Sequence, residues 1–179
     1  MDKYIKASEI ASKIFKLKLP KPKYADVAIT SSDSMAMGSF YERQIIDYVS
    51  NFLGLKVQYK INKENVRRYL FTIKNINYYL IGRADGLLYA SYSDKVNLYV
   101  YEHILEVKNM ISYSINDFNN DVPDYYIPQI RAYNYLYQLP VLFVAQCYDG
   151  YIIKNNPLEK DEVIKFLYDL KNILSMDSI

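Results

Sequence analysis

The 179-residue sequence has very little of two residue types on which many metal and catalytic sites depend. It contains one cysteine, Cys147, and one histidine, His103. A single cysteine excludes an internal disulfide, a four-cysteine zinc site and an iron–sulfur cluster. A single histidine excludes any mechanism that needs two. Cys147 stands among apolar residues in VLFVAQCYDG, so we expect a small core residue. His103 alternates away from Glu106 along its strand, and we expect it to be packed or hydrogen-bonded.

Long apolar runs are also missing. No run approaches the roughly 20 residues that span a bilayer, and MDKYIKASEIASKIFKLKLP carries charges where a secretory signal would be apolar. We therefore expect a cytoplasmic protein that does not bind membranes, in the host cytoplasm if the source is a virus. With 51% hydrophobic and 23% charged residues, the chain has the composition of one globular domain with its own core.

Positive charge is concentrated at the N-terminus. The first 23 residues carry seven lysines against Asp2 and Glu9, a balance of +5, whereas the remaining chain carries −3. Such a basic segment can contact the phosphates of a nucleic acid, and Lys13 and Lys16 are candidates for that role. The alternative is a solvated helix face, which the charge pattern alone favours.

The apolar periodicity predicts helices and strands in the order α, α, a β-meander, α, β, α. Helices are expected at 3–18, 39–54, 123–138 and 158–174, and strands at 56–62, 68–74, 78–82, 86–92, 96–110, 141–148 and 150–154. A loop is expected at 31–38 and a turn at 93–95. This order indicates an α/β fold, a mixed β-sheet core flanked by helices on both faces. Within the single domain 1–179 we distinguish a basic helix and loop (1–37), a core (38–138) and a closing strand and helix (139–179).

Two acidic residues stand in otherwise apolar surroundings. Glu42 shares a helix face with Ile45, Ile46 and Val49, where a carboxylate is costly unless it is paired. A salt bridge at the rim of the core is the alternative. Asp85, in LIGRADGLLY, lies between glycines that allow close approach of backbone or ligand. Taken alone, its DG pair is more typical of a turn.

A charged pair occupies a strand that reads as buried. In VYEHILEVKNM, Glu106 and Lys108 point to the same face as Ile104. Replacing a buried ion pair by apolar groups is often neutral or stabilising, so a retained pair suggests a function. An ion pair that protects an edge strand is the alternative. Gln129 lies on the inward face of the next helix with Tyr133. Alone it would be an ordinary hydrogen-bonded glutamine.

Together these residues suggest a reaction. Carboxylates on adjacent strands can converge on a hard cation such as Mg²⁺ or Mn²⁺. Such a metal lowers the pKa of bound water and neutralises phosphate charge. A neighbouring lysine can hold the attacking water or stabilise the transition state. This is the minimum equipment for hydrolysis of a phosphodiester bond.

The order of these motifs resembles the PD-(D/E)xK nuclease superfamily, whose fold is restriction-endonuclease-like. GRADGLL is similar to the first acidic motif, LEVK to the (D/E)xK motif, and QIRAY to the Gln-x-x-x-Tyr motif of the RecB-like branch. That branch includes the CRISPR-adaptation nucleases. The resemblance covers about residues 38–137, more than half of the chain.

The sequence departs from this branch at two points. RecB-like exonucleases usually carry a metal-binding histidine four residues after a glycine of the first helix, whereas here Gly38 is followed by Glu42. A glutamate there is more similar to the endonuclease and Holliday-junction-resolvase branches. CRISPR-adaptation nucleases also hold an iron–sulfur cluster, which one cysteine cannot. The chain therefore resembles the small cluster-free nucleases of archaeal viruses.

The resemblance implies a Mg²⁺- or Mn²⁺-dependent deoxyribonuclease, acting in DNA recombination or repair, that cuts internally or prefers single-stranded DNA. Asp85, Glu106, the Val107 carbonyl and Glu42 would bind metal, and Lys108 would position or activate water. Gln129 would orient Lys108 or a phosphate, with support from Tyr133. The candidates for contacts with the DNA backbone are Lys13, Lys16, Arg83 and Arg131. The alternatives are a homodimeric resolvase of branched DNA, and an inactive member that binds nucleic acid or a host protein.

Overall fold

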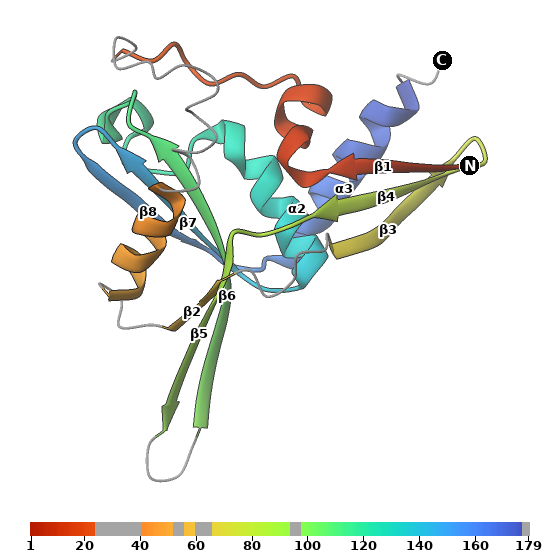
Figure 1. The fold of residues 1–179 in the computed structure, drawn as a ribbon. Helices are drawn as coiled ribbons and strands as arrows, with labels where there is room; N and C mark the ends of the chain where they lie inside the picture. Colours follow the sequence, from red (N-terminus) through yellow and green to blue (C-terminus); the bar gives the residue numbers. More distant parts are fainter. Residues whose placement is uncertain (24–40, 52–55, 60–65, 94–97, 177–179) are drawn as a thin grey trace.

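The computed structural model describes residues 1–23, 41–51, 56–59, 66–93 and 98–176 (Figure 1). The predicted loop at 31–38, most of the turn at 93–95 and the end of the predicted helix at Gly54 lie outside the described residues. Within the described parts, the chain forms an α/β fold of two mixed sheets with flanking helices, as the sequence predicts, except that one sheet was expected.

The larger sheet has five strands in the order β2-β5-β6-β7-β8. Its strands are β2 (Lys56–Tyr59), β5 (Gly86–Ser93), β6 (Leu98–Met110), β7 (Val141–Cys147) and β8 (Gly150–Asn156). Strand β6 pairs antiparallel with β5 and parallel with β7, so it is central. This position confirms the sequence prediction and excludes the edge-strand alternative for Glu106 and Lys108.

The smaller sheet has three strands in the order β1-β4-β3. Its strands are β1 (Asp2–Lys6), β3 (Val66–Ile73) and β4 (Ile76–Gly82). Strand β1 runs parallel to β4, and β3 runs antiparallel to it. In Figure 1 this sheet lies beside α3, and the chain passes from β4 directly into β5 of the larger sheet.

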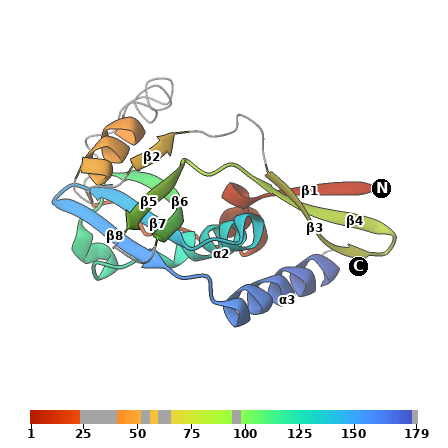
Figure 2. The ribbon, with the colours of Figure 1, turned by 90° about the horizontal axis from the view of Figure 1, so that it is seen from below.

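Helices cover both faces of the larger sheet (Figures 1 and 2). The helix over 41–51 packs on the face that carries Leu105 and Val107. Helix α2 (Ile127–Tyr137) packs on the opposite face, in the cluster that includes Ile104. Helix α3 (Lys160–Met176) packs against α2 and reaches the smaller sheet. None of the helices in the described parts combines the length and apolar character needed to cross a membrane.

The predicted N-terminal helix at 3–18 is wrong over its first part. Residues Asp2–Lys6 form strand β1, followed by a short 3₁₀ turn at Ala7–Glu9 and a π-helical turn at Ile10–Ile14. Ala7, Ile10 and Ala11 are buried, as the helical pattern predicted. The strand forms because Tyr4 and Ile5 are β-prone and find a partner in β4, more than 70 residues away in sequence. The spacing of apolar residues within a short segment cannot show that the segment pairs with a strand so distant in sequence.

Helix α2 is buried more extensively than its pattern predicts. Gln129, Tyr133 and Leu136 face the core as expected. Asn134 is also fully buried, and its Nδ2 donates to the Leu139 carbonyl at 2.8 Å. Because α3 packs against α2, the outward face of the isolated helix becomes an interior surface.

Candidate active site

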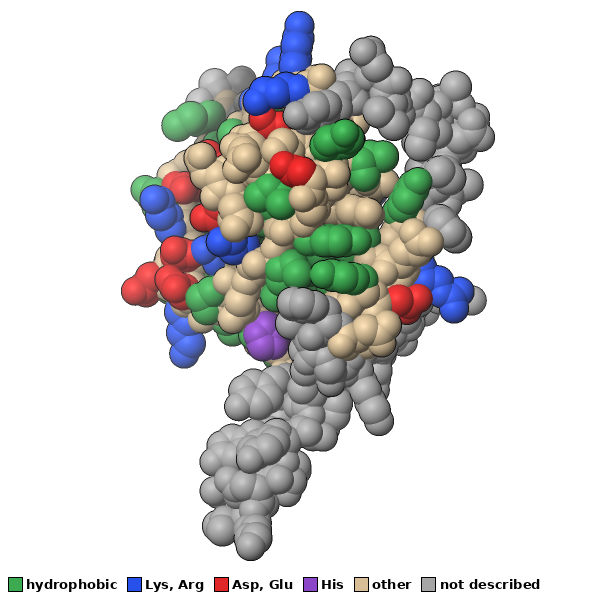
Figure 3. All heavy atoms as spheres, turned by 90° about the vertical axis from the view of Figure 1, so that its left-hand side faces the viewer, with side chains coloured by type: hydrophobic (Ala, Val, Ile, Leu, Met, Phe, Trp, Pro, Cys, Tyr) green, Lys and Arg blue, Asp and Glu red, His purple; other side chains and the backbone are tan. Residues whose placement is uncertain are grey.

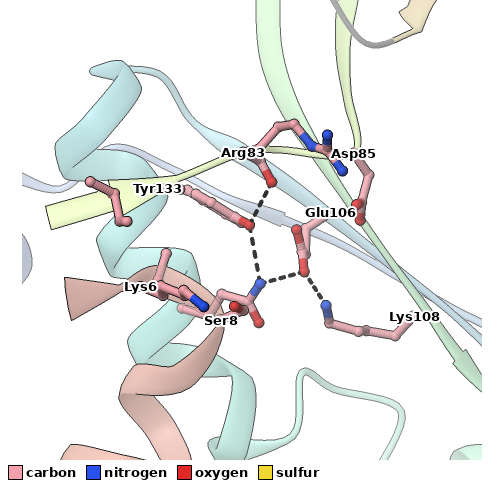
Figure 4. A pocket seen from close by; sticks show the side chains of 11 residues that line it. Lys6, Ser8, Arg83, Asp85, Glu106, Lys108 and Tyr133 are labelled. Atoms are coloured by element: carbon pink, nitrogen blue, oxygen red, sulfur yellow. Dashed lines mark hydrogen bonds and ion pairs between the residues drawn. The ribbon is translucent and has the colours of Figure 1, made fainter. Parts of the chain in front are cut away.

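A cavity of about 450 Å³ lies where the two sheets separate (Figure 4). The chain leaves β4 at Gly82 and enters β5 at Gly86, so Arg83, Ala84 and Asp85 bridge the sheets. The cavity is lined by Lys6, Ala7, Ser8, Ile81, Gly82, Arg83, Asp85, Glu106, Lys108, Gln129 and Tyr133. The structure therefore brings Asp85, the Glu106–Lys108 pair and the Gln129–Tyr133 pair together.

Close packing at Gly82 shapes one wall of this cavity. A Cβ at this position would lie 2.9 Å from Leu136 Cδ1 and 3.0 Å from both Ala7 Cβ and Tyr133 Cε1. A Cβ here would require the end of Leu136 to move and would crowd Ala7 and Tyr133, so glycine favours this close meeting of β4, the first 3₁₀ turn and α2. The approach holds Tyr133 against the strand end that precedes Asp85.

Glu106 is the most deeply buried charged residue of the described chain, with 1% of its surface exposed. Its Oε1 forms an ion pair with Lys108 Nζ and accepts a hydrogen bond from Gln129 Nε2 at 2.7 Å. Its Oε2 is buried and has no hydrogen-bond partner among the described residues. Leaving a buried carboxylate oxygen unsatisfied is costly, so this oxygen suits a ligand that comes from outside the chain.

Asp85 stands beside Glu106, immediately before the neighbouring strand β5 (Figure 4). Its Oδ2 accepts a hydrogen bond from the Val107 amide at 2.8 Å, which ties the start of β5 to β6. Burial and the negative charge of Glu106 raise the pKa of the Asp85 carboxyl to about 7, against the opposing influence of Lys108. Two carboxylates this close repel each other unless a proton or a cation lies between them.

Lys108 balances this negative charge. Its side chain is 22% exposed, and its Nζ lies 5.3 Å from the centroid of the Tyr126 ring. Burial disfavours the charged ammonium, but attraction to Glu106 and Asp85 outweighs burial and raises the pKa of Lys108 above its usual value. Lys108 therefore remains protonated at neutral pH. It is suited to donate hydrogen bonds, and not to remove a proton from water.

Helix α2 fixes both acids through side chains spaced four residues apart. Gln129 Nε2 donates to Glu106 and also to the Tyr133 hydroxyl at 3.2 Å. The Tyr133 hydroxyl in turn donates to the Arg83 carbonyl at 3.0 Å (Figure 4). The Tyr137 hydroxyl, one turn further, accepts from the Ala84 amide at 3.1 Å. This chain of bonds holds Glu106 and the segment before Asp85 in a fixed relation. The predicted role of Gln129, to orient Lys108 or a phosphate, remains a prediction.

Some predicted site residues lie elsewhere. Glu42 is partly exposed and does not line the cavity; its helix packs on the sheet face opposite Glu106. Arg131 forms an ion pair with Glu162 of α3 and lines a separate pocket. Lys13 pairs with Glu9 at 2.9 Å, and Lys16 donates to the Lys13 carbonyl at 2.6 Å. Their predicted roles in metal or DNA binding remain predictions, and of the predicted DNA contacts only Arg83 lines the cavity.

The sequence patterns missed three residues of this site. Lys6 and Ser8 line the cavity because β1 ends beside β4. Because a helix was predicted over residues 3–18, the sequence did not indicate this contact. Tyr137 supports the Ala84 backbone, and the signal that could have found it is its spacing of four from Tyr133 on the same helix face. Lys6 and Arg83 are exposed and place positive charge at the rim above the two acids.

The donor set fits a divalent cation of the magnesium type. Mg²⁺ is usually bound by one or two carboxylates, and its remaining positions hold water or substrate oxygens. Asp85 and the unpartnered Oε2 of Glu106 would supply the two carboxylates. The described residues contain no group of three or more His, Cys, Asp or Glu side chains able to hold a metal. A site for zinc or another metal that requires three such protein ligands is therefore not formed by the described residues.

Comparison with known proteins shows the fold. No protein-family model and no curated protein matches the sequence. Among solved structures, the fold is similar to an alkaline exonuclease from Laribacter hongkongensis, with a TM-score of 0.58 and 12% identity, over 97% of this chain and 87% of that one. The same exonuclease in complex with dAMP gives a TM-score of 0.61 and 12% identity, over 96% and 86%. The crystal structure of SSO0001 gives 0.55 and 13% identity, over 95% and 76%. The chain therefore has a fold similar to that of an alkaline exonuclease.

Proposed function

We propose that this protein is a Mg²⁺- or Mn²⁺-dependent nuclease that hydrolyses phosphodiester bonds of DNA. The observation that carries the proposal is the buried Glu106, with one carboxylate oxygen unsatisfied, next to the partly buried Asp85 and a protonated Lys108. A protein gains no stability from this arrangement, because both acids are desolvated and repel each other. A cation held between them would relieve the repulsion and give the pair a function.

The residues around the acids suit the chemistry of phosphate. Hydrolysis joins a water oxygen to phosphorus and breaks the bond from phosphorus to a sugar oxygen. A bound cation supplies a water of lowered pKa and neutralises phosphate charge. Lys108, as a protonated donor, would hold the attacking water or a phosphate oxygen in place. Lys6 and Arg83, exposed at the rim, would attract the DNA backbone.

Two observations favour different modes of cleavage. The fold is similar to that of an alkaline exonuclease, which favours cleavage from an end. Glu42 replaces the histidine of RecB-like exonucleases, which favours internal cleavage, although Glu42 does not line the cavity. We keep internal cleavage with a preference for single strands as the working proposal. Glu42 is a residue of this sequence, whereas the exonuclease activity is a property of a structural neighbour that is only 12% identical.

Closed-circular single-stranded DNA tests both the activity and its mode. The protein is incubated with the circle, or with the same strand linearised, in Mg²⁺, in Mn²⁺ and in EDTA. Cutting of the circle in the presence of metal establishes a nuclease that cuts internally. Degradation of the linear strand alone establishes an exonuclease. If neither is cut, a four-way junction tests the resolvase alternative, and inactivity on all three contradicts the proposal.

Variants connect the activity to this cavity. Lys108→Ala removes the cation that faces the acids and should abolish cutting. Lys171→Ala removes an exposed lysine of α3 that does not line the cavity, and should cut like the wild type. Equal activity of both variants would assign any observed cutting to another site or to a contaminant.

A further inference from the structure

One face of the smaller sheet carries a row of tyrosines. Tyr4 of β1 and Tyr69 of β3 are both directly opposite Tyr79 of β4, so the three side chains cross all three strands. Tyr4 and Tyr69 are 50% and 48% exposed, and Tyr69 lies next to a register shift in β3. The opposite face, with Ile5, Tyr78 and Leu80, is buried in the core. We call Tyr4, Tyr69 and Tyr79 the tyrosine row.

The rings of the tyrosine row already contact one another and a cation. The Tyr4 and Tyr79 rings are stacked with their centroids 5.7 Å apart, and Tyr69 meets Tyr79 edge-on at the same distance. The Arg67 guanidinium lies 5.0 Å from the Tyr79 centroid and 6.0 Å from that of Tyr4. These contacts hold the rings in place, so a flat ligand would not have to order them when it binds.

The tyrosine row adjoins the candidate active site. The next row toward the cavity on the same face is Lys6, Ile81 and Arg67, which are paired across the three strands. Lys6 and Ile81 also line the cavity. Since two residues along a strand span roughly 7 Å, the tyrosines begin about that distance beyond the cavity wall. A strand whose backbone lies over the acids would therefore pass directly onto them.

The charge of this face suits a polyanion. Lys6 and Arg67 are exposed on it, and Lys6 contacts Glu9 at 3.4 Å. Among the strand residues of the smaller sheet the one acid is Asp2, which accepts a hydrogen bond from Asn77 on the side of the tyrosines away from the cavity. On the opposite side of the molecule, described apolar side chains gather in the middle of the face, and most of the described acidic and basic side chains lie around them (Figure 3).

We propose that the tyrosine row binds unpaired bases of single-stranded DNA and leads the strand into the cavity that holds Asp85 and Glu106. This inference rests on the proposed nuclease function and names its substrate as a single strand. Aromatic rings stack on any base, whereas the bases of a duplex are already stacked on one another. The row therefore selects for unpaired DNA without selecting for sequence, and Arg67 and Lys6 contact the backbone between the rings and the cavity.

The test measures binding separately from cleavage. Fluorescence anisotropy with labelled oligo(dT), in EDTA, gives a dissociation constant that does not depend on catalysis. The variant with both Tyr4→Ala and Tyr69→Ala should bind at least about 10-fold more weakly. The matching double substitution by Phe retains the rings and should bind like the wild type. Tyr168→Ala, at a 65% exposed tyrosine of α3, is the control and should change nothing.

Salt dependence separates stacking from charge. Arg67→Ala should reduce the slope of log affinity against log salt by about 0.7, the value for one phosphate contact on a single strand. The tyrosine variants should weaken binding without changing this slope. A matching duplex should bind more weakly than oligo(dT) to the wild type and should be insensitive to the tyrosine substitutions.

Several outcomes would overturn the proposal. One is failure of the folded wild type to bind oligo(dT). Another is an Ala double variant that is folded, as its unfolding temperature shows, and binds oligo(dT) within about 2-fold of the wild type. Loss of self-association in that variant with unchanged DNA binding would assign the face to a second copy of the chain. Failure of the nuclease proposal is distinguishable, because tyrosine-dependent binding in EDTA would remain while no DNA is cut in metal.

Discussion

Strand β6 presents apolar side chains to one face of the larger sheet and charged side chains to the other, although both faces are covered by a helix. On one face Leu105 and Val107 are buried under the helix over 41–51. On the other, Glu106 and Lys108 face α2, flanked by Ile104. The first face is what burial predicts, since apolar contacts stabilise a fold in proportion to their area.

The second face lowers stability where it could have raised it. Glu106 is as buried as its apolar neighbours, yet it needs Lys108 and Gln129 to satisfy one oxygen and leaves the other unsatisfied. Adjacent Asp85 adds a second desolvated acid. The apolar face of β6 therefore stabilises the fold, and the charged face is the one that we propose binds a ligand.

The largest expected effect is on activity at the charged face. Glu106→Gln keeps the shape of the side chain and removes the charge that would bind metal, so the cleavage rate should fall by at least about 1,000-fold. The unfolding temperature should change little, because the lost attraction to Lys108 is offset by relief of the repulsion from Asp85, which still faces Lys108. Single-turnover cleavage and thermal unfolding of the same preparation check both statements. Retention of more than a tenth of the activity would contradict the assignment.

A substitution on the apolar face of β6 should lower stability and leave activity nearly unchanged. Leu105→Ala removes a fully buried side chain and should lower the free energy of unfolding by about 2–5 kcal/mol. Urea denaturation measures this loss. At a temperature where the variant is still folded, its cleavage rate per folded molecule should stay near that of the wild type. A large loss of activity in the folded variant would mean that the two faces are not independent.

A smaller effect is expected where α2 supports the acids. Gln129→Leu removes the donor to Glu106 Oε1 and should reduce activity by about 10- to 100-fold, the usual cost of losing a group that orients a metal ligand. Cleavage measured over a range of Mn²⁺ concentrations should show that part of this loss is recovered at high metal. Gln146→Leu, at a partly buried glutamine of β7 outside the cavity, is the control. Equal losses in both would indicate a general packing effect.

The smallest expected effect is on stability and its pH dependence. In the folded protein the pKa of Asp85 is raised to about 7, above its ordinary value of 3.8. Between these values the folded state holds a proton that the unfolded state has lost, so the contribution of Asp85 to stability falls as pH rises from about 4 to 7. At pH 8 without metal, Asp85→Asn should therefore stabilise the protein, by on the order of 2 kcal/mol.

Thermal unfolding at pH 5 and pH 8 in EDTA tests this sign. The gain from Asp85→Asn should be larger at pH 8, where the wild-type carboxylate is charged. Asp161→Asn, at an exposed position in the first turn of α3, should give no comparable gain. A wild type that is more stable than Asp85→Asn at pH 8 would show that the two acids do not repel each other in the folded state.

Local sequence patterns predicted most of the fold, because most elements carry a strong period of their own. The apolar alternation of β3 to β6 and the runs in β7 and α3 were readable without tertiary information. Strand β1 was not, since its pairing with β4 depends on a contact distant in sequence. The division into two sheets at Arg83 to Asp85 also escaped prediction, because a strand pattern does not state which partner each strand takes.

The candidate site was predictable where a residue contradicted its own surroundings. Burying a polar side chain is costly, and this cost made three residues recognisable in the sequence. They are Glu106 and Lys108 in a buried strand and Gln129 on an inward helix face. Lys6 gave no such signal, because an exposed lysine is ordinary wherever it occurs. Glu42 gave the signal, but its helix packs on the other face of the sheet. Polarity in an apolar pattern marks an unusual residue, and the topology decides which of these residues meet.

Calorimetric titration with Mn²⁺, in the absence of DNA, measures whether the charged face of β6 binds a metal. The wild type should bind Mn²⁺ at the pair formed by Asp85 and Glu106, and Glu106→Gln should weaken this binding by at least about 10-fold. Lys171→Ala should bind like the wild type. Absence of binding to the wild type, or equal binding to Glu106→Gln, would contradict the claim that the charged face of β6 is organised for a metal.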